Sequence, residues 1–201
     1  MNINYFREME AVIASLEGRR PTLLLHSCCG PCTSAVLEMV TPCFDTTVFF
    51  YNPNILPAEE YEKRLYWLRV LLDRAPFARG VELIVPDRDE PAFWAAARGL
   101  EAEPEGGARC TECFELRLSR TARAAKEGGF EFFATTLTVS PHKNAPLINA
   151  VGARLEQEQG VRWLPSDFKK KDGYRRSIQL SAEYGLYRQA WCGCGLGGSR
   201  A

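Results

Sequence analysis

Seven of the eight cysteines of this chain fall into three closely spaced groups. A Cys-Cys-Gly-Pro-Cys run occupies residues 28–32, a Cys-Thr-Glu-Cys pair residues 110–113, and a Cys-Gly-Cys turn residues 192–194. Thiolates at such spacings reach a common metal ion, or exchange electrons, with little rearrangement of the backbone. Because the groups are far apart in sequence, only a folded domain brings them together. The pattern predicts a sulfur-rich centre for metal binding or redox chemistry.

The composition describes one globular domain without a strong charge preference. The chain has 201 residues, of which 46% are hydrophobic, and its 25 basic and 25 acidic side chains balance. This length supports a single domain over residues 1–201, with residues 195–201 expected as a flexible tail. No apolar run reaches the ~18 residues of a membrane span, and residues 1–10 lack the order of a secretory signal. We therefore expect a cytoplasmic protein with no membrane partner.

A reducing compartment changes the meaning of the cysteines. In a secreted chain they would suggest a disulfide framework, whereas in the cytosol they indicate metal ligation or catalytic redox chemistry. Cys28 and Cys29 lie where a predicted strand turns into a helix, whose dipole and free N–H groups stabilise thiolates. Cys110 and Cys113 are spaced like half of a zinc or iron–sulfur site. Together the two pairs supply the four thiolates that a cubane cluster requires.

Three classes of protein fit the cysteines alone. Four thiolates also hold structural zinc, as in a zinc-stabilised nucleic-acid-binding module. Cys29 and Cys32 have the spacing of a thioredoxin-type dithiol, as in a cytosolic dithiol oxidoreductase. The third class is an iron–sulfur enzyme. Cys192 and Cys194 suit a cycling redox pair, because a disulfide across one residue is strained and easily reduced, or a second metal.

Short apolar runs alternate with helix-like stretches, which is typical of a mostly parallel sheet with helices on both faces. We expect strands at residues 22–26, 46–51, 81–85, 130–137 and 161–164. We expect helices at residues 4–17, 31–40, 57–74, 90–97, 144–159 and 174–187, and one that carries Cys110 and Cys113. The sequence thus predicts an α/β fold of the Rossmann-like or HUP-like kind. Since polar segments follow the strands directly, we expect a metal site at the carboxyl edge of the sheet.

Seven motifs along the chain resemble the QueH-type epoxyqueuosine reductases, formerly a family of unknown function. They occupy, in family order, residues 23–32, 51–55, 59–64, 103–113, 135–144, 166–171 and 186–194. The resemblance implies reduction of epoxyqueuosine to queuosine at the wobble position of the tRNAs for Asp, Asn, His and Tyr, the last step of queuosine biosynthesis. It implies a [4Fe-4S] cluster, room for an adjacent mononuclear iron, an external electron donor and no cobalamin.

Matching positions assign chemical roles under this resemblance. Cys28, Cys29, Cys110 and Cys113 are implied cluster ligands, and sequence alone does not decide between Cys29 and Cys32 for one of these positions. Cys192 and Cys194 are the implied redox pair. Asp167 is a candidate to donate a proton or to bind the second metal. His142 and Tyr174 are further proton-donor candidates, while a helix cap is the plain alternative for Asp167.

A basic stretch at residues 168–176 contains an aromatic residue and suits a phosphate-binding surface on which a base stacks. Its plain alternative is a solvated basic loop, and only the tRNA substrate implied by the resemblance favours binding. The candidate substrate-binding residues are Asn52, Asn54, His142, Lys143, Lys169, Lys170, Lys171, Tyr174, Arg175 and Arg188.

Overall fold

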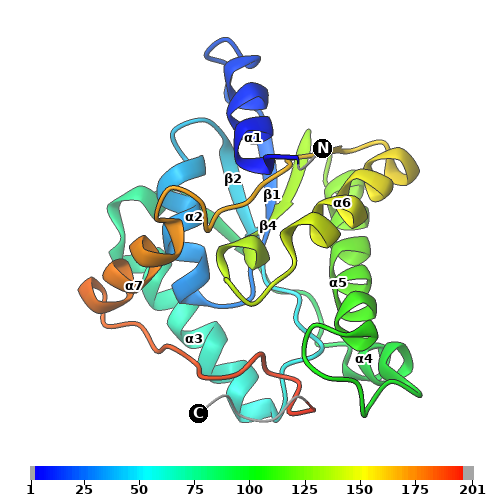
Figure 1. The fold of residues 1–201 in the computed structure, drawn as a ribbon. Coiled ribbons are helices and arrows are strands. Elements are labelled where there is room, and N and C mark those ends of the chain that lie inside the picture. The colour runs from blue at the N-terminus through cyan, green and yellow to red at the C-terminus, as the bar shows by residue number, and fades with distance from the viewer. Residues whose placement is uncertain (1–2, 197–201) are drawn as a thin grey trace.

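A parallel five-stranded sheet runs through residues 3–196, the part of the chain that this computed structural model describes (Figure 1). The strands are β1 (Thr22–His26), β2 (Asp45–Phe49), β3 (Glu82–Ile84), β4 (Phe132–Thr135) and β5 (Arg162–Trp163). Their order is β3-β2-β1-β4-β5, and every neighbouring pair is parallel. The predicted α/β fold with a parallel sheet is confirmed.

Seven α-helices and two 3-10 turns connect and cover these strands within residues 3–196. The helices are α1 (Tyr5–Ala14), α2 (Gly30–Val40), α3 (Ala58–Arg74), α4 (Glu90–Ala97), α5 (Ala108–Glu127), α6 (Ala145–Gln159) and α7 (Gly173–Glu183). The 3-10 turns are η1 (Pro76–Ala78) and η2 (Thr136–Val139). None of the helices described is both long enough and apolar enough to cross a membrane.

Alternating side chains of the strands build two cores, one on each face of the sheet. Leu23 and Leu25 of β1 pack with apolar residues of α1, α2 and α3, whereas Leu24 packs with those of α5 and α6. This follows from the two-residue period of a strand, because a strand buried on both faces is apolar throughout. Figure 1 shows α2 and α3 on one side of the sheet and α5 and α6 on the other. The expectation of helices on both faces is confirmed.

The strand order places a change of direction beside β1. The chain builds outward from β1 to β2 and β3, and then returns to add β4 and β5 on the other side. At such a point the loops after two adjacent strands diverge and leave a crevice, where ligands bind in open parallel sheets. Here the crevice lies between the segments after β1 and β4, where the backbone N–H of Cys28 donates to Thr136 Oγ1 at 3.4 Å.

Several predicted elements end earlier than expected, and for two of them the structure shows a local cause. The strand expected over residues 130–137 ends at Thr135, because Thr135 Oγ1 accepts a hydrogen bond from the backbone N–H of Leu137 and the chain turns into η2. The helix expected to residue 187 ends at Glu183, ahead of Gly185, whose φ of 63° is left-handed. Of the expected tail, residues 197–201 lie outside the described part, and Leu196 packs beside Phe93.

The close contact between α6 and β5 predicts the effect of one added methyl group. A Cβ at Gly152 would lie 2.2 Å from ring atoms of Trp163, whose Nε1 donates to Asn149 Oδ1 at 3.1 Å. We expect Gly152→Ala to lower the free energy of unfolding by about 1–3 kcal/mol, because the ring must move within a packed core. Urea unfolding measures this loss. The same exchange in a Trp163→Leu background should cost much less, and an equal loss in both backgrounds would contradict the explanation.

Candidate metal and substrate site

The first cysteine group forms a compact cluster of thiols at the N-terminus of α2. The sulfur atoms of Cys28, Cys29 and Cys32 all lie within 4.8 Å of one another, with Cys28 and Cys29 Sγ 3.7 Å apart. Gly30 permits this turn to approach α3, since a Cβ there would lie 2.9 Å from the carbonyl oxygen of Trp67. Three potential metal ligands are therefore presented together at the carboxyl end of β1.

Hydrogen bonding within this group makes the pKa values of its three thiols unequal. Hydrogen bonds with Cys29 and Cys32 hold the pKa of Cys28 well below its ordinary value. The bond with Cys28 raises the pKa of Cys29 to about 12, and it raises the pKa of Cys32 as well. Gln189 adds a further donor, since its Nε2 lies 3.0 Å from Cys29 Sγ. The group can thus offer a negatively charged sulfur to a cation.

The second and third cysteine groups meet each other. Cys110 and Cys113 of α5 line a small hollow of about 10 Å³ together with Cys192 and Cys194. Burial raises the pKa of Cys113 to about 11. Cys110 Sγ accepts a hydrogen bond from the backbone N–H of Gly106 at 3.2 Å. Four thiols from two distant parts of the chain therefore share one enclosed space.

A larger cavity joins the first and third groups at the carboxyl edge of the sheet. Cys28, Cys32 and Cys192 all line this cavity, which has a volume of about 420 Å³. Cys28 also packs against the apolar cluster that contains Cys110. All eight cysteines are free thiols in the structure. The predicted gathering of cysteines at one edge is therefore what the fold produces.

A buried ammonium group lies within the same cavity. Lys143, whose side chain is 9% exposed, donates from Nζ to Cys192 Sγ at 3.1 Å and to Glu105 Oε1 at 3.0 Å. Burial alone would lower the pKa of Lys143, but Cys192 and Glu105 raise it well above its ordinary value. Lys143 therefore keeps a positive charge beside a sulfur atom.

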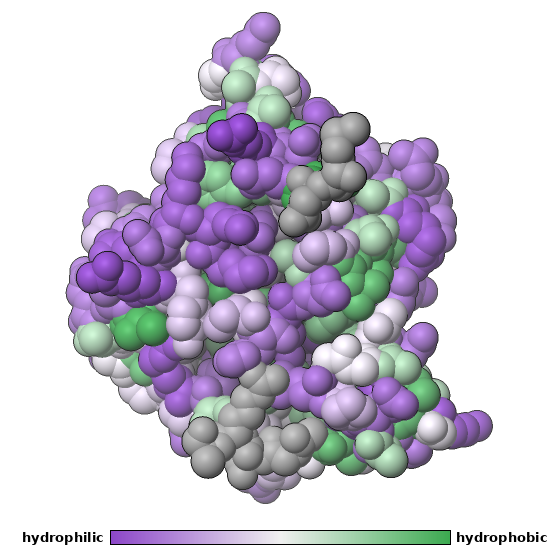
Figure 2. All heavy atoms as spheres, in the orientation of Figure 1, coloured by the Kyte–Doolittle hydropathy of each residue, from purple (hydrophilic) through white to green (hydrophobic). Residues whose placement is uncertain are grey.

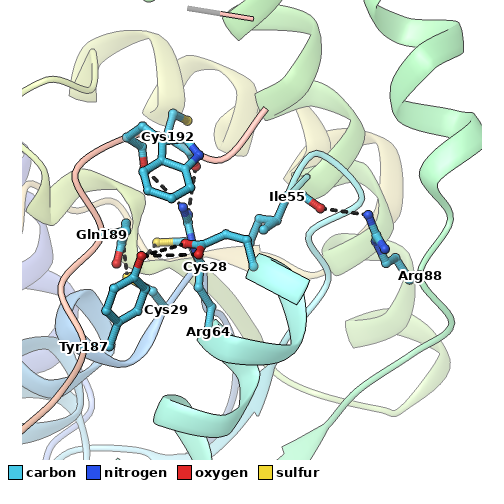
Figure 3. A network of polar contacts seen from close by, with 10 residues as sticks. Cys28, Cys29, Ile55, Arg64, Arg88, Tyr187, Gln189 and Cys192 are labelled. Carbon is cyan, nitrogen blue, oxygen red and sulfur yellow. Dashed lines mark hydrogen bonds and ion pairs between the residues drawn. The ribbon is translucent and has the colours of Figure 1, made fainter. Parts of the chain in front are cut away.

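The C-terminal segment, residues 187–194, is fastened to α3 by Arg64 (Figure 3). This guanidinium is 2% exposed and donates to the carbonyl oxygens of Cys192 (2.9 Å) and Trp191 (3.2 Å). Its Nε donates to Glu60 Oε1 at 2.7 Å, and the same carboxylate accepts from Tyr187 at 3.2 Å. One ion pair of α3 thus holds both ends of the segment that carries Cys192.

Gly193 allows the segment to come this close. Its φ is 121°, and a Cβ there would lie 3.1 Å from both Arg64 Nη1 and Ile55 Cγ1. Its carbonyl oxygen accepts a hydrogen bond from the backbone N–H of Leu56 at 2.8 Å. The residue between the two cysteines is therefore glycine for both conformational and packing reasons.

Four of the predicted substrate-binding residues line the large cavity: His142, Lys143, Tyr174 and Arg188. The guanidinium carbon of Arg188 lies 5.9 Å from the ring centroid of Tyr174, and both side chains are exposed. Hydrophilic residues cover most of the molecular face seen in Figure 2, which views the molecule as in Figure 1. A polar ligand can therefore reach the cavity past an aromatic–arginine pair.

The other predicted residues lie elsewhere. Asn52 and Asn54 are each 1% exposed, and Asn54 lines the hollow between the four thiols. Asp167 forms an ion pair with Lys169 at 2.7 Å in the loop after β5. Lys171 pairs with Glu10 of α1, also at 2.7 Å. Of the residues described, those that line the large cavity do not include Asp167, Lys169, Lys170, Lys171 and Arg175.

Three buried arginines of the site were not among the predicted site residues. Arg64 and Arg117 line the large cavity, and Arg109 and Arg117 line the smaller hollow. The sequence could have indicated Arg117 as a site residue, because residues at i, i+3 and i+7, here Cys110, Cys113 and Arg117, share one face of a helix. For Arg64, nothing in the local sequence identifies carbonyl groups more than 120 residues away as its partners.

We expect Arg64→Ala to release the C-terminal segment while leaving the rest of the fold intact. The exchange removes two hydrogen bonds to carbonyl groups and leaves Glu60 buried without its cation. Hydrogen exchange of residues 187–194 should accelerate at least tenfold, an opening free energy lower by about 1.4 kcal/mol. Arg74→Ala is a matched control, since Arg74 is exposed on the same helix and reaches only Tyr184 O, at 3.5 Å. Equal exchange rates in both variants would contradict this role.

Comparison with known proteins agrees with the motifs. A sequence model of the family described as "Epoxyqueuosine reductase QueH" matches residues 23–199. The protein of that name from Streptococcus pyogenes serotype M1 is 44% identical over 196 residues, which cover 96% of this chain and 77% of the relative. The protein of that name from Staphylococcus epidermidis is 42% identical over 198 residues, which cover 96% of this chain and 83% of the relative. The one from Thermotoga maritima is 38% identical over 179 residues, which cover 86% of this chain and 88% of the relative. The chain belongs to the epoxyqueuosine reductase QueH family.

Proposed function

We propose that this chain is an oxidoreductase that reduces epoxyqueuosine to queuosine at the wobble position of tRNA. Its relatives carry the name of that activity. The observation that carries the proposal is that Cys192 lines both the open cavity with Cys28 and Cys32 and the small hollow with Cys110 and Cys113, since reduction needs electron carriers beside a substrate site. By family resemblance the substrates are the tRNAs for Asp, Asn, His and Tyr, and the protein acts in the cytoplasm.

The donor set fits iron held by sulfur. Seven thiols from three segments lie at one edge of the sheet. The spaces that they line are also lined by the buried cations Arg64, Arg109, Arg117 and Lys143. Zinc would accept the same ligands but does not change oxidation state, so it could not carry the electrons of a reductase. We therefore propose a [4Fe-4S] cluster on Cys28, Cys29, Cys110 and Cys113, which when bound supplies single electrons. Cys32 remains a further candidate ligand of the cluster. An adjacent iron would be held by the thiols that the cluster does not use.

The reaction must break both carbon–oxygen bonds of the epoxide, form a carbon–carbon double bond and release the oxygen as water. It consumes two electrons and two protons. Oxidation of the Cys192 and Cys194 thiols to a disulfide would release the same two electrons and two protons, and an external donor would then reduce the pair again. Nothing in this balance calls for cobalamin.

Side chains of the cavity are suited to handle the protons. His142 and Tyr174 line it and carry groups that transfer protons. Lys143, held by Glu105, donates a hydrogen bond from Nζ to Cys192 Sγ at 3.1 Å and so fixes the position of one thiol of the proposed redox pair. Asp167 remains a candidate proton donor or second-metal ligand, although its carboxylate is engaged by Lys169.

The mouth of the cavity suits a single-stranded nucleotide. Bases in RNA loops stack on aromatic rings and on guanidinium planes, and Tyr174 and Arg188 offer one of each. The wobble base lies in such a loop, so its neighbours would be available for stacking. We propose that this pair, with His142, contacts the anticodon loop, while Lys169, Lys170 and Arg175 bind more distant phosphates.

We expect anaerobically purified protein to be brown and to hold about four iron and four sulfide ions per chain. Cys→Ser exchange at Cys28, Cys29, Cys110 or Cys113 should each abolish the cluster, while Cys192→Ser should keep it and lose turnover. Cys43→Ser is the control, because Cys43 packs against the main core. Turnover is measured as loss of one oxygen atom from the modified nucleoside by mass spectrometry. Colourless wild-type protein with stoichiometric zinc would contradict the proposal.

We expect Arg188 and Lys171 to differ in their contribution to tRNA binding. Phosphate contacts release counterions, so Arg188→Gln should weaken binding and reduce the slope of log K against log salt by about 1. Lys171→Ala should leave the slope unchanged, because Lys171 is directed to Glu10 and to the ring of Phe6. Filter binding at several salt concentrations measures both slopes. The reverse pattern would place the tRNA on the α1 side of the molecule.

A further inference from the structure

Arg117 of α5 is a buried cation for which no carboxylate is provided. It is 1% exposed, and its Nε donates to the carbonyl oxygen of Cys113 at 3.1 Å. Its Nη2 is buried and makes no hydrogen bond to any residue of the described range 3–196. None of the ion pairs found in that range includes Arg117.

Arg109 of the small hollow also makes no ion pair within residues 3–196, but its Nη1 donates to three backbone carbonyl oxygens of the loop before α5. Two other buried cations of the site are paired with carboxylates. Arg64 has Glu60 at 2.7 Å, and Lys143 has Glu105 at 3.0 Å. Glu105 is the one carboxylate among the residues that line the large cavity with Arg117. A buried charge without a partner is strongly unfavourable, so a group of opposite charge is expected next to Arg117.

Sulfur atoms are the groups that face Arg117. It lines the large cavity with Cys28, Cys32 and Cys192, and it lines the small hollow with Cys110, Cys113 and Cys194. Glu105, the carboxylate of the large cavity, pairs with Lys143. A guanidinium keeps its charge at any physiological pH, so the sulfur atoms that line both spaces are the groups placed to supply its counter-charge.

We propose that Arg117 is a positioning residue that supplies a fixed positive charge to the sulfur centre and thereby sets its reduction potential. This inference rests on the proposed function, because it requires that the cysteines hold a redox centre. A centre ligated by thiolates becomes more negative when it takes up an electron. A cation fixed beside it favours the reduced state, and removal of the cation favours the oxidised state.

The test compares Arg117→Met with Arg117→Lys in anaerobically prepared, iron-loaded protein. Redox titration followed by electron paramagnetic resonance should show that Arg117→Met lowers the equilibrium constant for reduction at least tenfold, which is about 59 mV for a one-electron couple. Arg117→Lys should stay much closer to the wild type, since it keeps the charge. Arg120→Met is the matched control on the same helix, because Arg120 reaches Glu127 at the surface at 3.9 Å. An unchanged potential in Arg117→Met would overturn the inference.

Metal-free protein provides a second measurement that does not depend on cluster retention. At pH 6 ordinary thiols are protonated, so a buried guanidinium has less counter-charge than in the loaded protein. Metal-free Arg117→Met should therefore unfold at the same temperature as the wild type or higher, whereas a purely packing role predicts a lower one. A metal-free variant less stable than the wild type would overturn the inference. Wild-type protein that binds no iron would instead contradict the proposed function.

Discussion

The central position of β1 determines where the chemistry of this protein can occur. All strands are parallel, so every connection that leaves the sheet in the strand direction does so at one edge, and β1 has a neighbour on each side. The change of direction between β1 and β4 opens the crevice at that edge. The Cys28 group follows β1 directly, so its place is determined by the sheet. The other cysteines reach it only because α5 and the C-terminal segment cross the same edge.

Buried charges then hold these elements in place. Arg64 binds the carbonyl groups of the C-terminal segment, and Lys143 donates to Cys192 itself. Each of these cations has a carboxylate partner, so its burial is compensated within the protein. Arg117 makes no ion pair in the described residues and lines the two spaces that hold the cysteines instead. The anionic sulfur centre that we propose would offset the burial of this cation.

The sequence predicted what depends on local pattern. Buried strands such as residues 22–26, helix starts at prolines, and the carboxyl edge as the site all follow from periodicity and topology. The cysteine groups were recognisable by spacing, and the place of the Cys28 group followed from its position at a strand end. Contacts between distant segments were not predictable in this way. Lys171 looks like its neighbours in a basic run, yet it pairs with Glu10 more than 150 residues away. Asn52 and Asn54 follow a strand, as ligand-binding residues often do, but their amides are buried.

The hydrogen bonds of Arg64 also bear on the order in which the site is assembled. During synthesis the thiols of residues 28–32 leave the ribosome about 160 residues before Cys192, and α3 is complete while the segment that it will hold has not yet been made. The half-finished chain therefore exposes three thiols grouped closely enough to hold one metal ion while the wall of the cavity is still missing. The cysteines of α5 and of residues 187–194 join them only later, so the full set of sulfur donors exists only once the C-terminal segment has docked.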